Sequence, residues 1–425
     1  MLSSQNPYNF NFQTIELLDG LSSDEISQHL LEYCAHYSTC FAYSSQENHF
    51  TTYIKGLLSN LDRKSIEPIA LSFSDEYSVK SLQQFFSRSH QWMNSLRICY
   101  QKRLSDEIIA ENGFLSVDES DFVKKGKNSA GVARQYCGRL GKTENCQAGV
   151  FLSYASENGI GLIDSKLYLP EKWFDDDYEE RRKECHIPPE MSFQTKNEIA
   201  KKMIQDVFKS NFFPIECIGC DASFGSDHTF LDSLPENVHY FASVRENEKI
   251  FRKMPQVTIP AHPPGKRGRP CKHPRSTEDP VAIKSILNDD TVPWVTRTIA
   301  EGAKGPVIAE IKCVRCISSR TENNHFLPKN EIWVYIRKHE GGNIKYFISN
   351  YSVETPLSTL DEMSTKRWSI EQCFQECKSH LGMSHYETRT YQAWHKHMLL
   401  VMIAHLFVTI MRNEFKKKIY TSPCQ

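Results

Sequence analysis

The chain has 425 residues, which is enough for roughly two to three domains of about 150 residues each. Hydrophobic residues make up 40% of it, a share that excludes wholesale disorder. Lys and Arg number 51 and Asp and Glu 52, so the net charge is −1. A chain with this balance has no global basic field, which excludes tight DNA binding by bulk charge.

Cysteine content and apolar segments bear on the cellular compartment. Fourteen cysteines are too few in a chain of this length for a disulfide scaffold, so we expect reduced thiols. The first basic residue is Lys55, so the sequence lacks the charged start of a signal peptide. The longest apolar run, Met398 to Met411, is too short to cross a bilayer. We therefore expect a cytoplasmic protein without a membrane partner, and a buried helix at this run.

Residues 1–110 carry a helical pattern. Five apolar residues of this segment fall on one face of a helix at about 100° per residue, namely Leu82, Phe85, Phe86, Met93 and Leu96. We predict a helical domain over residues 1–110 and interpret it as a DNA-binding domain. Its net charge is acidic, so any DNA contact there must be local.

Short apolar segments bounded by turn residues replace this pattern over residues 111–250. The predicted strands are residues 114–117, 148–154, 160–163, 215–220 and 239–244. Between the third and fourth, Thr195 and Glu198 form a capping-box pattern at the start of a helix that continues to Ser210. Three strands, a helix and a strand are the order in which an RNase H-like sheet begins, so we assign residues 111–250 to the first part of such a core.

Residues 251–360 interrupt this core. Seven prolines between residues 251 and 290 predict an exposed loop, and β-rich segments follow, ending in a hairpin around Gly341 and Gly342. Helices resume at about Ser364 and complete the core over residues 361–425. The predicted fold class is therefore α/β, an RNase H-like core interrupted by a β-rich insertion, with an N-terminal helical domain and C-terminal helices.

Three acidic residues could form one site. Asp118 and Asp221 each follow a predicted strand, where a sheet presents side chains to a site. Glu371 shares one helix face with Arg367 and Lys378, since spacings of four and seven residues return to nearly the same angle. Carboxylates suit Mg²⁺, and two such ions can serve phosphoryl transfer while the two cations hold phosphates. On spacing alone, a solvated ion-pair ladder on the helix surface is the more ordinary interpretation.

The spacing of Arg367, Glu371 and Lys378 resembles the R-E-K part of the Y-R-E-K signature of bacterial insertion-sequence DDE transposases. Further segments resemble the insertion sequence family numbered seven hundred and one. In chain order they are Val117-Asp118-Glu119, Lys124-Lys125-Gly126, residues 131–138, Asn145-Cys146-Gln147, Leu167-Tyr168-Leu169-Pro170, Arg367-Trp368 and Trp394-His395-Lys396-His397. The resemblance extends from about Tyr53 to Phe407.

This resemblance implies Mg²⁺-dependent DNA strand transfer, with Asp118, Asp221 and Glu371 as catalytic residues and ligands of two Mg²⁺ ions, for which Mn²⁺ could substitute. It implies double-stranded DNA as the partner, both element ends and target, held by a homodimer. Two departures stand out. The signature tyrosine would fall at Ser364. The family usually has Thr-Gly after the first acids, whereas this chain has Ser120-Asp121. Asp121, like Glu119, could therefore compete for the role of Asp118.

Two basic segments are candidate DNA contacts. Lys266, Arg267, Arg269 and Lys272 surround an Arg-Gly-Arg-Pro sequence that resembles an AT-hook, which would place arginines in an A·T-rich minor groove. Lys124, Lys125 and Arg134 belong to a second basic segment after Asp118, suited to phosphates rather than to base readout. A solvated loop and a solvated charged face are the respective alternatives.

The histidines at 395, 397 and 405 are expected to pack helices or face DNA rather than to bind metal. The sequence as a whole predicts a DNA transposase that recognises the terminal inverted repeats of its own element, in which metal-activated water attacks first and the freed 3′-hydroxyl then attacks target DNA. A catalytically inactive, sequence-specific DNA-binding protein and a stand-alone RNase H-like nuclease remain as alternatives.

Overall fold

The computed structural model describes residues 23–73, 78–88, 91–261, 271–302, 305–339 and 341–421. Its contacts divide the chain into two compact units. We call residues 12–215 and 368–425 the terminal unit, and residues 1–11 and 216–367 the central unit. Each is described by itself.

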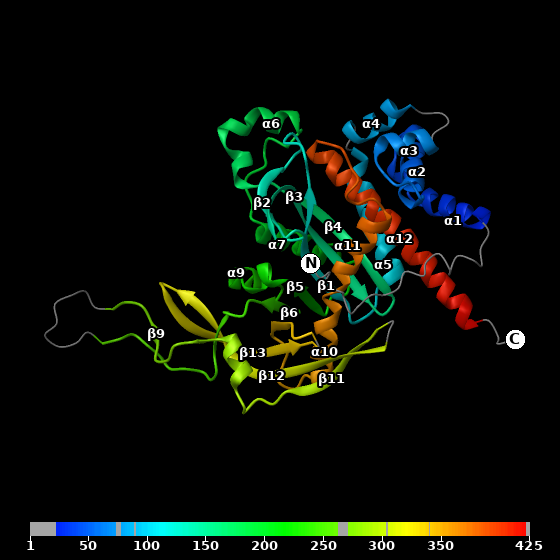
Figure 1. Ribbon diagram of the computed structural model, residues 1–425. Helices are drawn as coiled ribbons and strands as arrows, with labels where there is room; N and C mark the ends of the chain where they lie inside the picture. Colours follow the sequence, from blue (N-terminus) through cyan, green and yellow to red (C-terminus); the bar gives the residue numbers. More distant parts are fainter. Residues whose placement is uncertain are drawn as a thin grey trace. The chain divides into compact units, whose positions relative to one another are not determined.

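The first part of the terminal unit is helical, as predicted. Its helices are α1 (Ser23–Ala35), η2 (Ser38–Cys40), α2 (Ser44–Leu58), α3 (Ile66–Phe73), α4 (Val79–Ser87) and α5 (Gln91–Ile108). The five residues predicted on one helix face belong to two helices, because α4 ends at Ser87 and α5 begins at Gln91. Of the five, Leu82, Phe85, Phe86 and Leu96 are buried and Met93 is half-buried. The Phe85 ring stacks on that of Trp92 with centroids 4.8 Å apart. The long helix α12 (Tyr391–Thr421) runs beside α2, α4 and α5 (Figure 1).

Four antiparallel strands form the sheet of the terminal unit. They are β1 (Phe114–Val123), β2 (Ala133–Cys137), β3 (Lys142–Ser156) and β4 (Gly159–Tyr168), and β3 pairs with each of the other three. The sequence pattern placed the end of the first strand before Asp118, but β1 continues to Val123 because β3 pairs with it along its whole length. Asp118 therefore lies in mid-strand, opposite Phe151.

Helices cover this sheet. Short helices η3 (Glu171–Phe174), η4 (Asp176–Tyr178) and α6 (Glu179–Glu184) lead to α7 (Lys196–Ser210), which contacts β3 and β4. The predicted capping box at Thr195 and Glu198 is present. A further helix, α11 (Ser369–His380), contacts β1, β3 and β4. The three strands predicted at the start of the core are β1, β3 and β4, and α7 is the predicted helix, whereas β2 was not predicted.

The central unit is built on a mixed sheet. Its strands run in the order β10 (Val281–Ala282), β7 (Lys249–Phe251), β12 (Gly305–Glu322), β13 (His325–Lys338), β14 (Ile344–Ser349), β6 (His239–Val244) and β5 (Cys217–Cys220), with β11 (Val295–Gly302) paired to β12. β5 and β6 are parallel, and the predicted hairpin is the antiparallel pair β13 and β14. β8 (Val257–Thr258) and β9 (Arg275–Ser276) form a separate ribbon, and the helices are α8 (Ala222–Gly225), α9 (His228–Asp232), η5 (Ile283–Asn288) and α10 (Leu357–Lys366).

Helix α10 is fixed to this sheet by buried polar groups. The Tyr335 hydroxyl donates to Asp361 Oδ1 at 2.7 Å, and Arg337 Nη1 donates to the carbonyl and the hydroxyl of Ser364 at 2.9 and 3.0 Å. Ser364 is buried, so the position at which the family's signature tyrosine would fall is part of the core and not a surface that DNA can contact.

The apolar run predicted as a buried helix lies in α12. By length and composition alone, Tyr391–Phe415 is the one helix among the described residues that could cross a bilayer, and 78% of its most apolar window is buried inside the protein. A core helix has this composition when it packs against other elements on all sides. The α/β class, the β-rich insertion and the helical ends are all as predicted.

Candidate active site

Asp118 lies on the face of β1 that α11 covers. Successive side chains of a strand point to opposite faces, so Asp118 and Phe122 share one face and Glu119 points to the other. The Lys378 ammonium of α11 lies 5.4 Å from the centre of the Phe122 ring, which identifies the face. Asp118 is half-buried, and its Oδ1 accepts the backbone N–H of Glu119 at 2.7 Å.

Glu371 is in the first turn of α11 and Lys378 is in its last turn. The sequence pattern placed both on one helix with Arg367, starting near Ser364. That prediction was wrong about the helix, because α10 ends at Lys366 and α11 begins at Ser369. The chain changes partners at this point, since α10 packs in the central unit and α11 packs on the sheet of the terminal unit. Arg367 is buried and is the C-cap residue of α10.

Lys378 links α11 electrostatically to β1. Burial lowers the pKa of Lys378, and the nearby Arg139 guanidinium lowers it further, while the carboxylates of Asp121 and Asp118 oppose the shift. The ammonium is therefore held close to the first predicted acid in a partly dehydrated position. A phosphate group bound there would meet a cation whose hydration has already been reduced.

Asp221 follows β5 directly, as predicted, and caps α8. Its Oδ1 accepts the Ser223 N–H at 3.0 Å, the Ser223 hydroxyl at 2.7 Å and the Phe224 N–H at 3.3 Å. The chain approaches β6 closely here, because a Cβ atom on Gly225 would lie 2.0 Å from the Ser243 carbonyl oxygen. All three donors use one oxygen of the carboxylate, whose orientation is thereby fixed.

The donor set fits a hard divalent cation. Asp118, Asp221 and Glu371 offer carboxylate oxygens only, the ligands that Mg²⁺ and Mn²⁺ prefer. Asp118 and Glu371 lie in the terminal unit and Asp221 in the central unit. Within the described part of the chain, no three His, Cys, Asp or Glu side chains are grouped closely enough to hold a metal ion.

The two neighbouring acids of Asp118 have partners of their own. Glu119 points to the α7 face and forms an ion pair with Lys196, the first residue of α7. Asp121 is buried, and its Oδ2 accepts the Gly138 N–H at 2.7 Å, which ties β1 to the turn between β2 and β3. By strand alternation Glu119 leaves β1 on the face opposite Asp118, whereas the Asp121 carboxylate lies near enough to Lys378 to oppose the lowering of its pKa by burial.

The predicted DNA-contact residues differ in their surroundings. Lys124 donates to the Tyr386 carbonyl at 3.2 Å and lies 3.4 Å from the centre of the Tyr386 ring, and burial lowers its pKa to about 8. Lys125, Arg134 and Lys272 are exposed. The predicted contacts at Lys266, Arg267 and Arg269 lie outside the described residues.

In the motif Trp394 to His397, the side chains of Trp394, Lys396 and His397 are buried and bonded to residues outside the motif. Trp394 Nε1 donates to the Tyr386 hydroxyl at 3.2 Å, and the Lys396 ammonium donates to the carbonyls of Phe85, Phe86 and Arg88 at 2.7–3.0 Å. His397 Nδ1 lies 2.9 Å from the Tyr53 hydroxyl. These contacts fasten α12 to the helices before it. Of the two expected roles for these histidines, helix packing is the one observed at His397.

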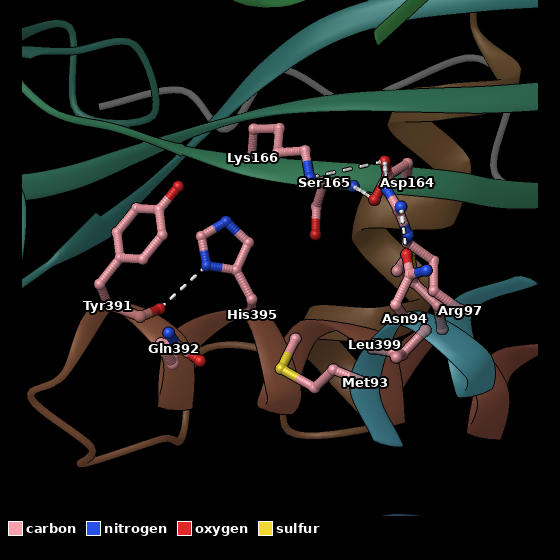
Figure 2. Close-up of a pocket in the computed structure, with 11 residues that line it drawn as sticks. Met93, Asn94, Arg97, Asp164, Ser165, Lys166, Tyr391, Gln392, His395 and Leu399 are labelled. Carbon is pink, nitrogen blue, oxygen red and sulfur yellow. Dashed lines mark hydrogen bonds and ion pairs between the residues drawn. The ribbon is translucent and has the colours of Figure 1, made fainter. Parts of the chain in front are cut away.

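A cavity of about 280 Å³ lies along β4, between α5 and α12, and Figure 2 shows its lining. The Leu167 N–H donates to His395 Nε2 at 3.3 Å, and His395 Nδ1 lies 2.9 Å from the Tyr391 carbonyl, so both ring nitrogens are occupied. Burial lowers the pKa of His395 to about 3, which keeps the ring neutral. Asp164 in this cavity is bound by Arg97 at 3.2 Å. The cavity is thus a feature of the packing at the edge of β4, and the predicted acids do not line it.

Two features were not predicted from the sequence. Arg139, in the turn between β2 and β3, acts on Lys378, but it is far from α11 in sequence and only the fold brings the two together. A polar hollow in the central unit is lined by Arg245 and Lys249 together with hydroxyl groups from β12. The polar stretch between β6 and β7 is its sequence signal, and such a stretch predicts an ordinary turn and not a binding site.

Comparisons with known proteins identify the family of the chain. The model of the DDE superfamily endonucleases matches residues 36–306, and that of the transposase DDE domain matches residues 218–407. The probable transposase for insertion sequence element IS701 from Microchaete diplosiphon is 26% identical over 222 residues, which are 52% of this chain and 54% of that protein. The chain thus matches about half the length of this relative.

Among solved structures, a piggyBac transposase synaptic complex with hairpin DNA is similar with a TM-score of 0.43 and 10% identity, covering 98% of this chain and 83% of that one. The NurA nuclease from Sulfolobus solfataricus has a TM-score of 0.26, also at 10% identity, covering 78% and 94% of the two chains. The family models carry the assignment, because the first matches well over half of the sequence. The chain belongs to the DDE superfamily endonucleases.

Proposed function

We propose that this chain is a DNA transposase that binds the terminal inverted repeats of its own element and performs Mg²⁺-dependent strand cleavage and strand transfer. The observation that supports this most directly is the pair of family matches, since residues 36–306 include Asp118 and Asp221, and residues 218–407 include Asp221 and Glu371. The protein would act in the bacterial cytoplasm as a homodimer on double-stranded DNA.

Asp118, Asp221 and Glu371 would hold the divalent cations, with Mn²⁺ able to replace Mg²⁺. When bound, such ions supply Lewis-acid activation of water and of the scissile phosphate. Lys378 would bind a phosphate oxygen beside Asp118, because its ammonium is already positioned and partly dehydrated there. The bond from Asp221 Oδ1 to the start of α8 would keep that carboxylate in one orientation.

The reaction has two balanced steps. In the first, a water oxygen bonds to the phosphorus at the element end, the bond to the 3′-oxygen breaks, and that oxygen leaves as a hydroxyl. In the second, this 3′-hydroxyl bonds to a target phosphorus and a target 3′-oxygen leaves with the proton. Each step is a displacement at phosphorus, so no oxidant or reductant is needed.

The test replaces each acid by its amide: Asp118→Asn, Asp221→Asn and Glu371→Gln. Asn caps a helix as well as Asp does, so the Asp221 variant keeps α8 in place and loses only the charge. We expect each variant to lose about a thousandfold or more of the Mg²⁺-dependent cleavage of a duplex that contains an element end, equal to about 4 kcal/mol in the barrier. Binding of the same duplex should persist.

Glu119→Gln is the matched control, because Glu119 neighbours Asp118 but points to the opposite face and pairs with Lys196. It should cleave like the unchanged protein. Retained cleavage in all three amide variants would overturn the assignment of the acids. An unchanged protein that binds ends without cutting them would favour the inactive DNA-binding alternative, and one that cuts without joining would favour the nuclease.

A further inference from the structure

The central unit contains a polar hollow of about 230 Å³, formed by the turn after α8, the start of β7, the end of β12 and the start of β13. Three hydroxyl groups line it, those of Ser226, Ser319 and Thr321, together with Arg245 and Lys249. The aromatic ring of Phe326 is exposed at its rim. Hydroxyl donors and cations around a water-accessible hollow are the groups that bind phosphate in proteins.

Arg245 and Lys249 form no ion pair with any acid among the described residues. Glu248 is the one acid in its lining, and it already bonds His228 Nε2 at 2.9 Å. Nearby, Glu246 pairs with Lys284 at 3.2 Å, and Asp232 pairs with Arg320 at 2.7 Å and with Lys329. Within the described residues, the side chains of Arg245 and Lys249 make neither an ion pair nor a hydrogen bond. Two positive charges thus remain uncompensated.

The backbone holds these groups in a fixed arrangement. The Arg245 N–H donates to Ser226 Oγ at 3.2 Å, which leaves the Ser226 hydroxyl proton to be donated elsewhere. Ser319 Oγ donates to the Lys249 carbonyl at 2.7 Å and joins β12 to β7. The close approach of Gly225 to Ser243 keeps the turn against β6, so the hollow and Asp221 are fixed in the same unit, five residues apart at Ser226.

We propose that this hollow binds a phosphate group through Arg245, Lys249 and Ser226, and that in the working protein this group is a backbone phosphate of the DNA that is cut. The claim that this phosphate belongs to DNA rests on the proposed function. The claim that the hollow binds a phosphate group does not. Contacts of this kind fix the position of DNA along the protein without reading its sequence. The hollow would therefore hold the duplex next to the loop that carries Asp221.

The experiment measures binding of a labelled 30-base-pair duplex to the full chain in EDTA, from 50 to 200 mM KCl. Each lost phosphate contact lowers the slope of log affinity against log salt by about 0.9. Arg245→Ala with Lys249→Ala removes the contacts to this one phosphate, so it should reduce the slope by about 0.9 and weaken binding at 0.1 M KCl by about ten- to a hundredfold. Arg245→Lys with Lys249→Arg should retain the slope.

Lys284→Ala is the matched control, since this lysine lies on the same unit but is already paired with Glu246, and it should leave the slope unchanged. Thermal melts of all variants check folding. Inorganic phosphate provides the second arm: at equal ionic strength it should displace DNA from the unchanged protein better than chloride does, and lose this advantage in the double Ala variant.

An unchanged slope in the double Ala variant overturns the DNA contact, and an unchanged phosphate effect as well overturns the site. A phosphate effect that depends on the two cations, with an unchanged DNA slope, would mean that the hollow takes a free anion and would overturn the DNA source. These outcomes are separate from failure of the proposed function, which is read from cleavage by the acid variants.

Discussion

The motif from Trp394 to His397 on α12 and the pair Asp118 and Lys378 both belong to the terminal unit, and their surroundings differ. Lys396 gives its three donors to three backbone carbonyls, and His397 is bonded to Tyr53. Lys378 makes no hydrogen bond with the described residues and is held only by burial, two aromatic rings and nearby charges.

This difference shows that a residue of a family motif can have one of two roles: it can stabilise the fold, or it can take part in the reaction. Polar groups that satisfy one another inside the core hold the fold, because each would be costly to bury alone. A half-buried polar group whose hydrogen-bond donors or acceptors are not all used by the fold can bind a substrate or an ion. Changes in the first set should therefore lower stability and spare the chemistry of the molecules that still fold, and changes in the second set should do the reverse.

Helix α11 offers the sharpest test of this division, because it carries both the predicted ligand Glu371 and the buried acid Glu376. Glu371 is half-buried, whereas Glu376 is buried and bonds His405 Nε2 at 2.6 Å and Arg412 Nη2 at 3.3 Å, which ties α11 to α12. Removing one partner from a buried charge cluster leaves the others uncompensated. We expect Glu376→Ala to lower the free energy of unfolding by about 3–5 kcal/mol, measured by chemical denaturation.

The control is Glu387→Ala, which removes an exposed acid paired with Arg63 and should cost about 1 kcal/mol or less. Burial raises the pKa of Glu376, but bonding to His405 and the charge of Arg412 outweigh it and leave the value at about 2. A lowered folded pKa gives stability that is present above the unfolded value near 4.5 and is lost as pH falls towards 2. The penalty of the variant should shrink over that window, and a pH-independent penalty would contradict the ionic role.

Lys396 tests the other side of the comparison. Lys396→Met keeps the length of the side chain but leaves the carbonyls of Phe85, Phe86 and Arg88, at the end of α4, without their donor. We expect a loss of about 2–4 kcal/mol in the free energy of unfolding, since each buried carbonyl loses a hydrogen bond from the ammonium. Cleavage per folded molecule should stay unchanged. Lys80→Met, at an exposed position of α4, is the control and should stay within about 0.5 kcal/mol.

Sequence patterns predicted much of this fold because they follow backbone periodicity. The capping box at Thr195, the strand before Asp221 and the β13 and β14 hairpin are local signals, and all three are present. The break between α10 and α11 was missed because the residues around Arg367 carry neither Gly nor Pro. Packing of the two helices on different units ends α10 there, and no helical wheel contains that information.

The candidate site was harder to predict from the sequence than the fold was. Spacing placed Glu371 and Lys378 on one stripe, and Asp118 was the predicted first acid, but the sequence left Glu119 and Asp121 as competitors for that role. Strand alternation and the partner Lys196 separate Glu119 from Asp118, and such cross-element contacts arise only when distant segments meet. The same holds for Arg245 and Lys249, whose lack of partners is a property of the fold.

The smallest effect is expected at His228, beside the hollow of the central unit. Its bond to Glu248 raises the pKa of His228 despite burial. A raised folded pKa gives stability that is full below the unfolded value near 6.5 and is lost as pH rises through the folded value. The unchanged protein should therefore lose roughly 0.5 kcal/mol or less between pH 6 and pH 8 through this group, and His228→Gln and Glu248→Gln should both remove that loss in parallel denaturation curves. If either variant kept the full pH dependence, the ion pair would not be its source, and Glu248 would be available to oppose the phosphate proposed for the hollow.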